Sequence, residues 1–316
     1  MFVDGVGIGC ADAAVNPFGA ANLPALERLI GGTLNEDILR EGGRHGSAAG
    51  VAVAIDATLG VAGRPQSGTG QTALLTGRNA PALFGRHFGS WVPTTLRALL
   101  ASRSLFAAAQ SAGRRTMFAN TVPPPLPGMR RPAAFPYAAH RAGLERRGRE
   151  ALARGAAVPA SLAADGWQAA GARVPPITPE WCGETLAGLA ADADLTVFAH
   201  YATDAVGHRR DLAAGVAALE LLDRFLGALL TSLDPGILLV VTSDHGNLED
   251  ARVGHTRNPV PLIAAGPGRE RSTRDACLLT DVAPALLAHL GVAGPSAVGS
   301  RADDRPVFPE PPAPSP

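Results

Sequence analysis

Short apolar runs separated by helical periodicity constrain the fold of this chain more than any other feature. Three such runs cover residues 195–199, 237–241 and 260–264, and each has the length of a buried strand. Between the first two, leucine, valine and phenylalanine recur at helical spacing from 212 to 229. Residues 51–55 and 116–119 also read as strands, and 104–112 reads as a helix. Strands that alternate with helices predict a mostly parallel sheet covered on both faces, a three-layer α/β/α sandwich.

Composition divides the chain into four segments. Residues 1–121 and 191–300 are expected to form two parts of one core. The segment 122–190 is rich in proline, alanine and arginine, which predicts a small inserted cap with an arginine-rich helix over about 140–154. The proline-rich tail 301–316 is predicted to be disordered. The first strand would hold only residues 1–3, so either this strand is short or the true start lies upstream.

Charge and cysteine content narrow the class of protein. The formal net charge is +0, which gives no argument for a nucleic-acid or anionic membrane partner. Every basic side chain is arginine, which excludes lysine chemistry. The three cysteines lie far apart and lack CxxC spacing, which argues against a disulfide framework. No signal peptide and no membrane-spanning run is visible. We expect a cytoplasmic protein without nucleic-acid or membrane partners, and the oligomeric state stays open.

Acids and histidines cluster just after the predicted strands. Three carboxylates and three imidazoles take part: Asp4, Asp204, His208, Asp244, His245 and His255. Because the carboxyl ends of parallel strands meet at one edge of a sheet, we expect these side chains to converge. The set is large enough for two divalent metal ions, for which Mn is the first choice and Zn or Mg are alternatives. Two adjacent metals can hold both the attacking and the leaving oxygen in phosphoryl transfer.

Three motifs in order resemble the metalloenzyme domain of the alkaline phosphatase superfamily. They are Asp-x-x-x-His at 204–208, Ser-Asp-His-Gly-Asn at 243–247 and His-Thr-x-Asn-Pro-Val-Pro at 255–261. Within this superfamily, the chain most resembles cofactor-independent phosphoglycerate mutase, and phosphopentomutase is also related. The resemblance covers roughly 1–120 and 194–292. It implies two metal sites, one formed by Asp204, His208 and His255 and the other by Asp4, Asp244 and His245.

The same resemblance implies a serine or threonine nucleophile after a Gly-x pair at a helix start. Gly70-Gln71-Thr72 fits this pattern, so Thr72 is the predicted nucleophile, and Ser67 and Thr69 are the alternatives. Residues 64–72 are predicted to form a loop before a helix that starts near 73. Free backbone N–H groups at such a helix start would suit a phosphate.

Further polar residues are candidates for supporting roles. Arginine forks match phosphate oxygens, so four residues are predicted to bind substrate, with structural pairing as the alternative: Arg78, Arg86, His87 and Arg257. Asn247 and Glu249 either orient metal ligands or belong to surface turns.

The sequence therefore predicts a two-metal phosphomutase, similar to phosphoglycerate mutase, that acts on a small phosphorylated metabolite. A metal-dependent phosphatase or phosphodiesterase of the same superfamily is the first alternative. The predicted cap is smaller than the family's substrate domain, and the family's lysine near the metals is missing. A non-catalytic metal-binding relative is the second alternative.

Overall fold

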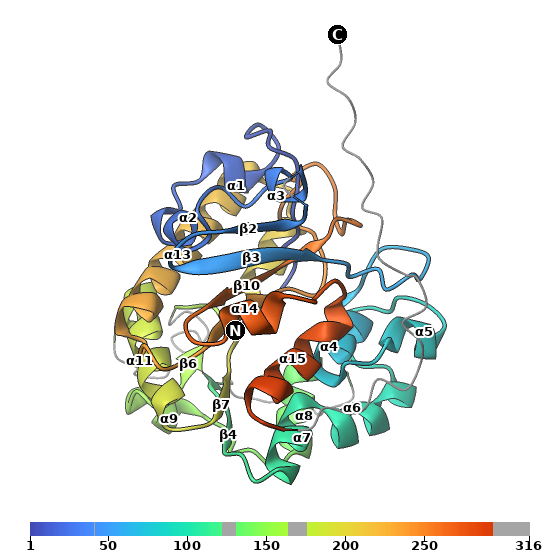
Figure 1. The fold of residues 1–316 in the computed structure, drawn as a ribbon, viewed down its shortest axis with the longest axis vertical. Helices are drawn as coiled ribbons and strands as arrows, with labels where there is room; N and C mark the ends of the chain where they lie inside the picture. The colour runs from blue at the N-terminus through green and yellow to red at the C-terminus, as the bar shows by residue number, and fades with distance from the viewer. Residues whose placement is uncertain (41, 122–130, 164–175, 293–316) are drawn as a thin grey trace.

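A six-stranded sheet forms the centre of the computed structural model, which describes residues 1–40, 42–121, 131–163 and 176–292 (Figure 1). The strand order is β2-β3-β10-β9-β1-β8. The strands are β1 (Phe2–Val3), β2 (Arg44–Gly46), β3 (Gly50–Ile55), β8 (Ala199–His200), β9 (Leu239–Thr242) and β10 (Val260–Ala265). β1 is parallel to β8 and β9, whereas β10 is antiparallel to β9 and β3, and β2 is antiparallel to β3. Hence β3, β9, β1 and β8 share one direction, which confirms a mostly parallel sheet.

Two pairs of short strands continue the parallel arrangement beyond β8. β7 (Leu195–Val197) leads into β8 and pairs with β4 (Thr116–Phe118), and β5 (Asn120–Thr121) pairs with β6 (Val158–Pro159). The Asn120 side chain joins β5 to β8, because its amide donates to Ala199 O at 2.7 Å and its Oδ1 accepts from Ala199 N at 2.8 Å.

Helices cover both faces of the sheet, so the predicted three-layer sandwich is confirmed (Figure 1). Along β3, Val51 and Val53 point into one hydrophobic core, and Ala52 and Ala54 point into the other. The first core is closed by α4 (Ser67–Thr76), α6 (Arg97–Arg103), α7 (Leu105–Ser111), α8 (Ala134–Arg141) and α15 (Val282–His289). The second is closed by α2 (Pro24–Ile30), α11 (Pro179–Ala191) and α13 (Leu212–Ser232).

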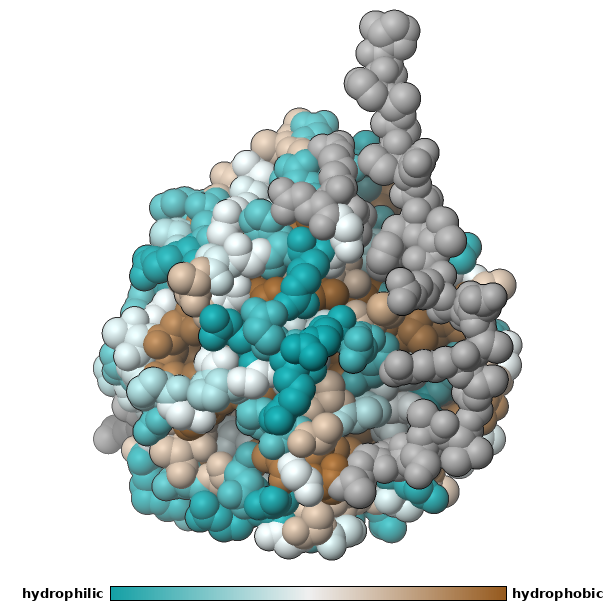
Figure 2. Space-filling model, in the orientation of Figure 1, coloured by the Kyte–Doolittle hydropathy of each residue, from teal (hydrophilic) through white to brown (hydrophobic). Residues whose placement is uncertain are grey.

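Shorter helices connect these layers. They are α1 (Pro17–Ala20), α3 (Asp37–Arg40), α5 (Ala80–Phe84), α9 (Arg149–Ala153), α12 (Ala202–Gly207) and α14 (Arg269–Thr273), with the 3₁₀ turns η1 (Thr94–Leu96) and η2 (Leu279–Asp281). Figure 2 shows hydrophilic side chains interspersed with smaller apolar areas over one face. Within the described part of the chain, no helix is both long and apolar enough to cross a bilayer.

The described part of the predicted cap packs into the core layers. α8 buries Phe135, whose ring stacks on Phe2 of β1 with centroids 4.5 Å apart. α11 packs along α13. The predicted helix over 140–154 is wrong, because α8 ends at Arg141 and α9 begins at Arg149, with Gly143 at φ +70° between them. The boundaries at 122 and 190 stay predictions, and the tail 301–316 lies outside the described residues.

Candidate metal centre

The six predicted ligands meet at one edge of the sheet. Asp4 directly follows β1, Asp204 lies in the first turn of α12 after β8, and Asp244 comes two residues after β9. Their ligand atoms form two sets, within each of which all atoms lie within 4.8 Å of one another. One set is Asp204, His208 and His255, and the other is Asp4, Asp244 and His245. The structure thus brings together the two groups that the motifs implied.

Imidazole rings of the two sets lie against one another. In the first set, His208 Nε2 lies 3.3 Å from Asp204 Oδ2, and His255 Nε2 lies 3.6 Å from Asp204 Oδ1. In the second set, His245 Nε2 lies 3.4 Å from Asp4 Oδ1. The rings of His245 and His255 stack with centroids 3.9 Å apart. Two ions bound in these sets would therefore be neighbours.

The set formed by Asp4, Asp244 and His245 is buried, and some of its carboxylate oxygens lack a hydrogen-bond donor. Among the described residues, Asp4 Oδ1 and both carboxylate oxygens of Asp244 are buried and have no hydrogen-bond partner. Burial, reinforced by the charge of Asp204, raises the pKa of Asp244 to about 7. Burial and the charge of Asp244 raise the pKa of Asp4 well above its usual range. Because unpaired buried carboxylates are costly, a divalent cation fits this donor set.

The other set, Asp204, His208 and His255, is more open, and the pKa of its carboxylate is low. Burial raises the pKa of Asp204, but the hydrogen bond with His255 and the charge of His245 outweigh it and lower this pKa to about 2. Asn247 Nδ2 also donates to Asp204 Oδ1 at 2.7 Å. The His208 side chain is 54% exposed. The centre therefore combines a buried half with a half that solvent and substrate can reach.

The loop after β1 approaches the ligand helix closely. Thr203 Oγ1 donates to Asp4 O at 2.6 Å. Gly5 has φ +70°, and a Cβ there would come within 2.6 Å of Asp204 Oδ1. Only glycine combines this backbone conformation with this space. Gly5 therefore allows the two halves to lie together.

Glu249 ties three ligand-bearing loops to one another. Its carboxylate accepts from Gly7 N at 3.0 Å, from Asn247 N at 2.7 Å, from Asn258 Nδ2 at 3.0 Å and from the Thr256 hydroxyl. These donors belong to the segments that carry the ligands at 4, 244–245 and 255. Glu249 and Asn247 are both 0% exposed, so the surface-turn alternative is wrong.

The helix with the predicted nucleophile starts earlier than expected. α4 begins at Ser67, so residues 67–72 are helical rather than a loop. Thr72 is fully buried, and its Oγ1 donates to Gly68 O at 2.7 Å inside the helix. Thr69 Oγ1 accepts from Phe88 N at 3.1 Å. Ser67 Oγ lies 2.9 Å from His245 Nε2, so among these three hydroxyls Ser67 is the one hydrogen-bonded to a candidate ligand.

The glycines of α4 serve close packing, which explains the wrong loop prediction. A Cβ at Gly68 would come within 2.2 Å of Trp91 O, and one at Gly70 within 3.1 Å of Asp244 O. The predicted phosphate cradle is also wrong at its first positions, because Gly68 N donates to Gly89 O and Thr69 N donates to Phe88 O.

Gln71 is a site residue that the sequence prediction missed. Its Nε2 donates to Asp4 Oδ2 at 3.2 Å. Residues four apart share one face of a helix, so a helix from Ser67 would have placed Gln71 beside it. The four-residue spacing of Ser67 and Gln71 could therefore have identified Gln71, but the glycines of this segment led to the prediction of a loop instead of a helix.

The predicted substrate-binding residues separate into two groups. Arg78 follows the far end of α4, whose ten residues rise about 15 Å from Ser67. The Arg86 guanidinium lies over the Phe84 and Phe88 rings. His87 Nε2 contacts Val61 O at 3.2 Å, in the loop that precedes Ser67.

His87 and Arg257 each have contacts or neighbours near the start of α4 or the candidate ligands. Burial is the largest cause that lowers the pKa of His87, and the charge of Arg257 lowers it further. Arg257 is exposed and comes two residues after His255. His255 Nδ1 in turn lies 2.9 Å from Pro65 O, beside the start of α4. His87 and Arg257 therefore stay predictions for substrate binding, with His87 in contact with the loop that precedes α4.

Comparison with known proteins agrees with this arrangement. Residues 180–294 match the model of the Metalloenzyme superfamily. Over 114 residues the chain is 39% identical to a 2,3-bisphosphoglycerate-independent phosphoglycerate mutase of Halobacterium salinarum, covering 33% of this chain and 22% of the relative. Over 108 residues it is 41% identical to a phosphopentomutase of Allorhizobium ampelinum, covering 33% of this chain and 26% of the relative. The chain thus aligns with only about a quarter of each of these relatives.

The fold likeness extends further than the sequence likeness. A cold-active alkaline phosphatase from Shewanella sp. has a TM-score of 0.53 at 13% identity, over 92% of this chain and 98% of the other. The family match includes five of the six candidate ligands, and the fold brings Asp4 and Ser67 to them. The chain therefore carries a metalloenzyme-superfamily segment over residues 180–294 within an alkaline phosphatase-like fold.

Proposed function

We propose that this protein is a metal-dependent phosphoryl-transfer enzyme that uses two divalent ions. The observation that carries the proposal is the pairing of two three-ligand sets with one serine hydroxyl at their edge. Asp204, His208 and His255 would hold one ion. Asp4, Asp244 and His245 would hold the other, where buried carboxylate oxygens have no protein donor among the described residues. Carboxylate and imidazole ligands favour Mn, with Zn and Mg as alternatives.

Ser67 is the proposed nucleophile in place of Thr72. Bound metals would lower the pKa of a hydroxyl and offset the charge of the phosphoryl oxygens. Ser67 Oγ would form a bond to phosphorus while the bond from phosphorus to the leaving oxygen breaks, and the hydroxyl proton would pass to water, which leaves a phosphoserine at the start of α4. Gln71 fixes the Asp4 carboxylate, and Asn247 fixes the Asp204 carboxylate. These hydrogen bonds set the positions of the ligand oxygens before substrate arrives.

The proposed substrate is a small phosphorylated metabolite. This class is the one named in the matched mutase and phosphopentomutase relatives. His87, which contacts the loop before Ser67, and the exposed Arg257 would offer donors for the anionic part of such a substrate. Return of the phosphoryl group to a second hydroxyl of the substrate would make the enzyme a phosphomutase. Transfer to water would make it a phosphatase.

Paired variants of α4 test the nucleophile. With Mn present, phosphorylated metabolites and p-nitrophenyl phosphate are assayed for released phosphate and for isomerised product. We expect Ser67→Ala to lower kcat by at least about 10³-fold, because the attacking atom is gone. Thr72→Val removes the buried hydroxyl but keeps a side chain of similar size. It should cost about 1 kcal/mol of stability and reduce kcat less than about tenfold.

The outcomes of these assays separate the alternatives. Loss of turnover in Thr72→Val with full turnover in Ser67→Ala would return the role to Thr72. Isomerised product without released phosphate supports the mutase, and released phosphate supports the phosphatase. Binding of Mn without turnover on any phosphorylated compound would favour the non-catalytic relative.

A further inference from the structure

Arg210 has a backbone conformation that is unfavourable for arginine. It lies in the turn between α12 and α13, and its φ is +55°. In this left-handed region the Cβ of an L-residue crowds its own backbone, so glycine is the usual residue. Two other non-glycine residues in the described part of the chain have a positive φ, Leu59 and Leu162, and both are buried in the hydrophobic cores. Arg210 is exposed, so burial does not offset its strain.

The guanidinium of Arg210 is not paired within the described part of the chain. No carboxylate there lies within ion-pairing distance of it, and it forms no hydrogen bond with those residues. Arg252, on the loop that precedes His255, is instead ion-paired with Asp250 at 2.8 Å. The donors of Arg210 are therefore available to an anion from outside the protein.

The guanidinium lies beside a ligand loop of the open half of the centre, which Asp204, His208 and His255 form. A Cβ at Gly254 would lie 4.0 Å from Arg210 Nη2. Gly254 directly precedes His255, and Arg210 follows His208 by two residues. The Nε2 atoms of these two histidines lie 3.3 Å apart. Arg210 therefore borders both histidine-bearing segments of the open half.

The position of this cation favours an anionic ligand. The open half has one carboxylate and two imidazoles, so a divalent ion held there would leave a net positive charge. A guanidinium beside that charge is repelled unless negative charge lies between the two. A phosphate group supplies this charge, and its oxygens match the guanidinium fork. Phosphate oxygens in contact with Arg210 would thus pair the side chain and offset the repulsion.

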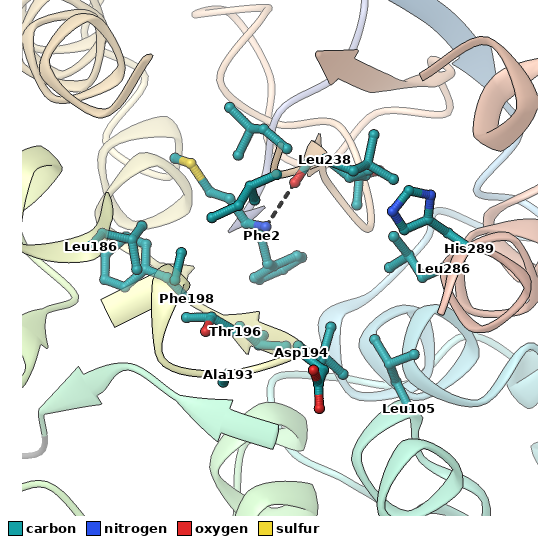
Figure 3. Close-up of a pocket in the computed structure, with 18 of the residues that line it drawn as sticks. Phe2, Leu105, Leu186, Ala193, Asp194, Thr196, Phe198, Leu238, Leu286 and His289 are labelled. Carbon is teal, nitrogen blue, oxygen red and sulfur yellow. Dashed lines mark hydrogen bonds between the residues drawn. The ribbon is translucent and has the colours of Figure 1, made fainter. Parts of the chain in front are cut away.

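The cavity in Figure 3 does not suit the same anion. It has a volume of about 250 Å³, lies near the start of β1 and is lined by none of the six candidate ligands. Its lining is mostly apolar, as Leu105, Phe198 and Leu286 illustrate, and it includes the carboxylate of Asp194. Phosphate is therefore expected beside Arg210 rather than in this cavity.

We infer that Arg210 is a substrate-binding residue whose guanidinium holds phosphate oxygens at the open half of the centre. The inference rests on the proposed function and assigns one more residue to it. Contact with the anion would pair the exposed side chain, which accounts for an arginine rather than a glycine at φ +55°.

Arg210→Gly separates the role of the side chain from that of the backbone. Glycine adopts a positive φ without strain, so we expect the Tm of the metal-free chain to rise by about 2 °C. We expect the same variant to bind inorganic phosphate at least about tenfold more weakly in calorimetry of the Mn-loaded chain. Arg210→Lys keeps the charge but loses the fork, and should weaken phosphate binding about threefold. With p-nitrophenyl phosphate, the KM of Arg210→Gly should rise at least about tenfold while kcat changes less than about threefold.

Arg209→Ala is the matched control. It removes the same charge one residue away, at an exposed position without a positive φ. Its phosphate affinity should change less than about threefold, because an exposed charge without a direct contact is screened by solvent. Unchanged phosphate affinity in Arg210→Gly would overturn the inference. An equal loss in both variants would also overturn it, because the loss would then come from overall charge.

Phosphate calorimetry separates this inference from the proposed reaction, since binding needs no turnover. A chain that binds Mn and phosphate through Arg210 but acts on no phosphorylated compound would refute the reaction and support the phosphate site. Turnover with a KM that Arg210→Gly leaves unchanged would support the reaction and refute the phosphate site.

Discussion

Asp244→Asn should make the metal-free protein more stable, although it removes a proposed metal ligand. Asp244 is 0% exposed, and neither carboxylate oxygen has a donor among the described residues. Its pKa rises from 3.8 to about 7. At about 1.36 kcal/mol per pKa unit, the ionised side chain destabilises the metal-free fold at pH 8 by about 4 kcal/mol. Asparagine has a similar shape and carries no charge, so most of this cost should disappear.

The sign of the pH dependence follows from the raised pKa. The folded state holds the Asp244 proton more tightly than the unfolded state. The penalty is therefore absent below pH 4, grows between about pH 4 and 7, and is complete above pH 7. The stability difference between Asp244→Asn and the original chain should be about 4 kcal/mol at pH 8 and much smaller at pH 5.

Urea denaturation with a chelator at pH 5 and pH 8 measures this difference. Addition of Mn at 100 times its Kd should then stabilise the original chain by about 2.7 kcal/mol per site and the variant by less. Asp250→Asn is the matched control, because Asp250 is ion-paired with Arg252 and the hydrogen bond from Arg252 lowers its pKa. A metal-free Asp244→Asn chain that is less stable at pH 8 would refute the reasoning, since Asp244 would then need its charge without a cation.

Other expectations concern affinity, packing and reactivity. Mn affinity should rise at least about tenfold per pH unit between pH 5 and 7, because binding displaces the Asp244 proton; calorimetry in two buffers measures the proton release. Glu249→Gln places an amide donor against groups that already donate, so it should weaken Mn binding about 10- to 100-fold in a metal titration. Asp223→Ala should cost about 2 kcal/mol in urea denaturation, because this carboxylate caps α2 through two backbone N–H groups. Iodoacetamide at pH 8 should label exposed Cys277 in the folded protein and Cys182 only after unfolding, because burial raises the pKa of Cys182 to about 12; mass spectrometry of the peptides checks this.

The parts of the fold that follow from periodicity were predictable. The apolar run at 260–264 corresponds to β10, and the helical spacing after residue 212 corresponds to α13. The reversed direction of β10 was not predictable from its composition, because a strand buried on both faces reads as the same apolar run in either direction. The convergence of the ligands was predictable, because it depends on where strands end rather than on side-chain detail.

The start of α4 could not be placed correctly from local composition. Gly68 and Gly70 lower the helix propensity of the 67–72 segment, and they are present because neighbouring backbone packs against them. That packing comes from the 88–91 loop and from Asp244, which lie far away in the sequence. Tertiary contacts thus turned a predicted loop into a helix, and Ser67 at the start of this helix, rather than Thr72, is hydrogen-bonded to His245.

Metal content per chain tests the two-site account most directly. Elemental analysis after equilibration with Mn and removal of free ions should give two ions per original chain. His208→Ala and Asp244→Asn should each retain about one, since each variant breaks a different half of the centre. A single ion in the original chain, or the loss of both ions in either variant, would contradict two separate three-ligand sites.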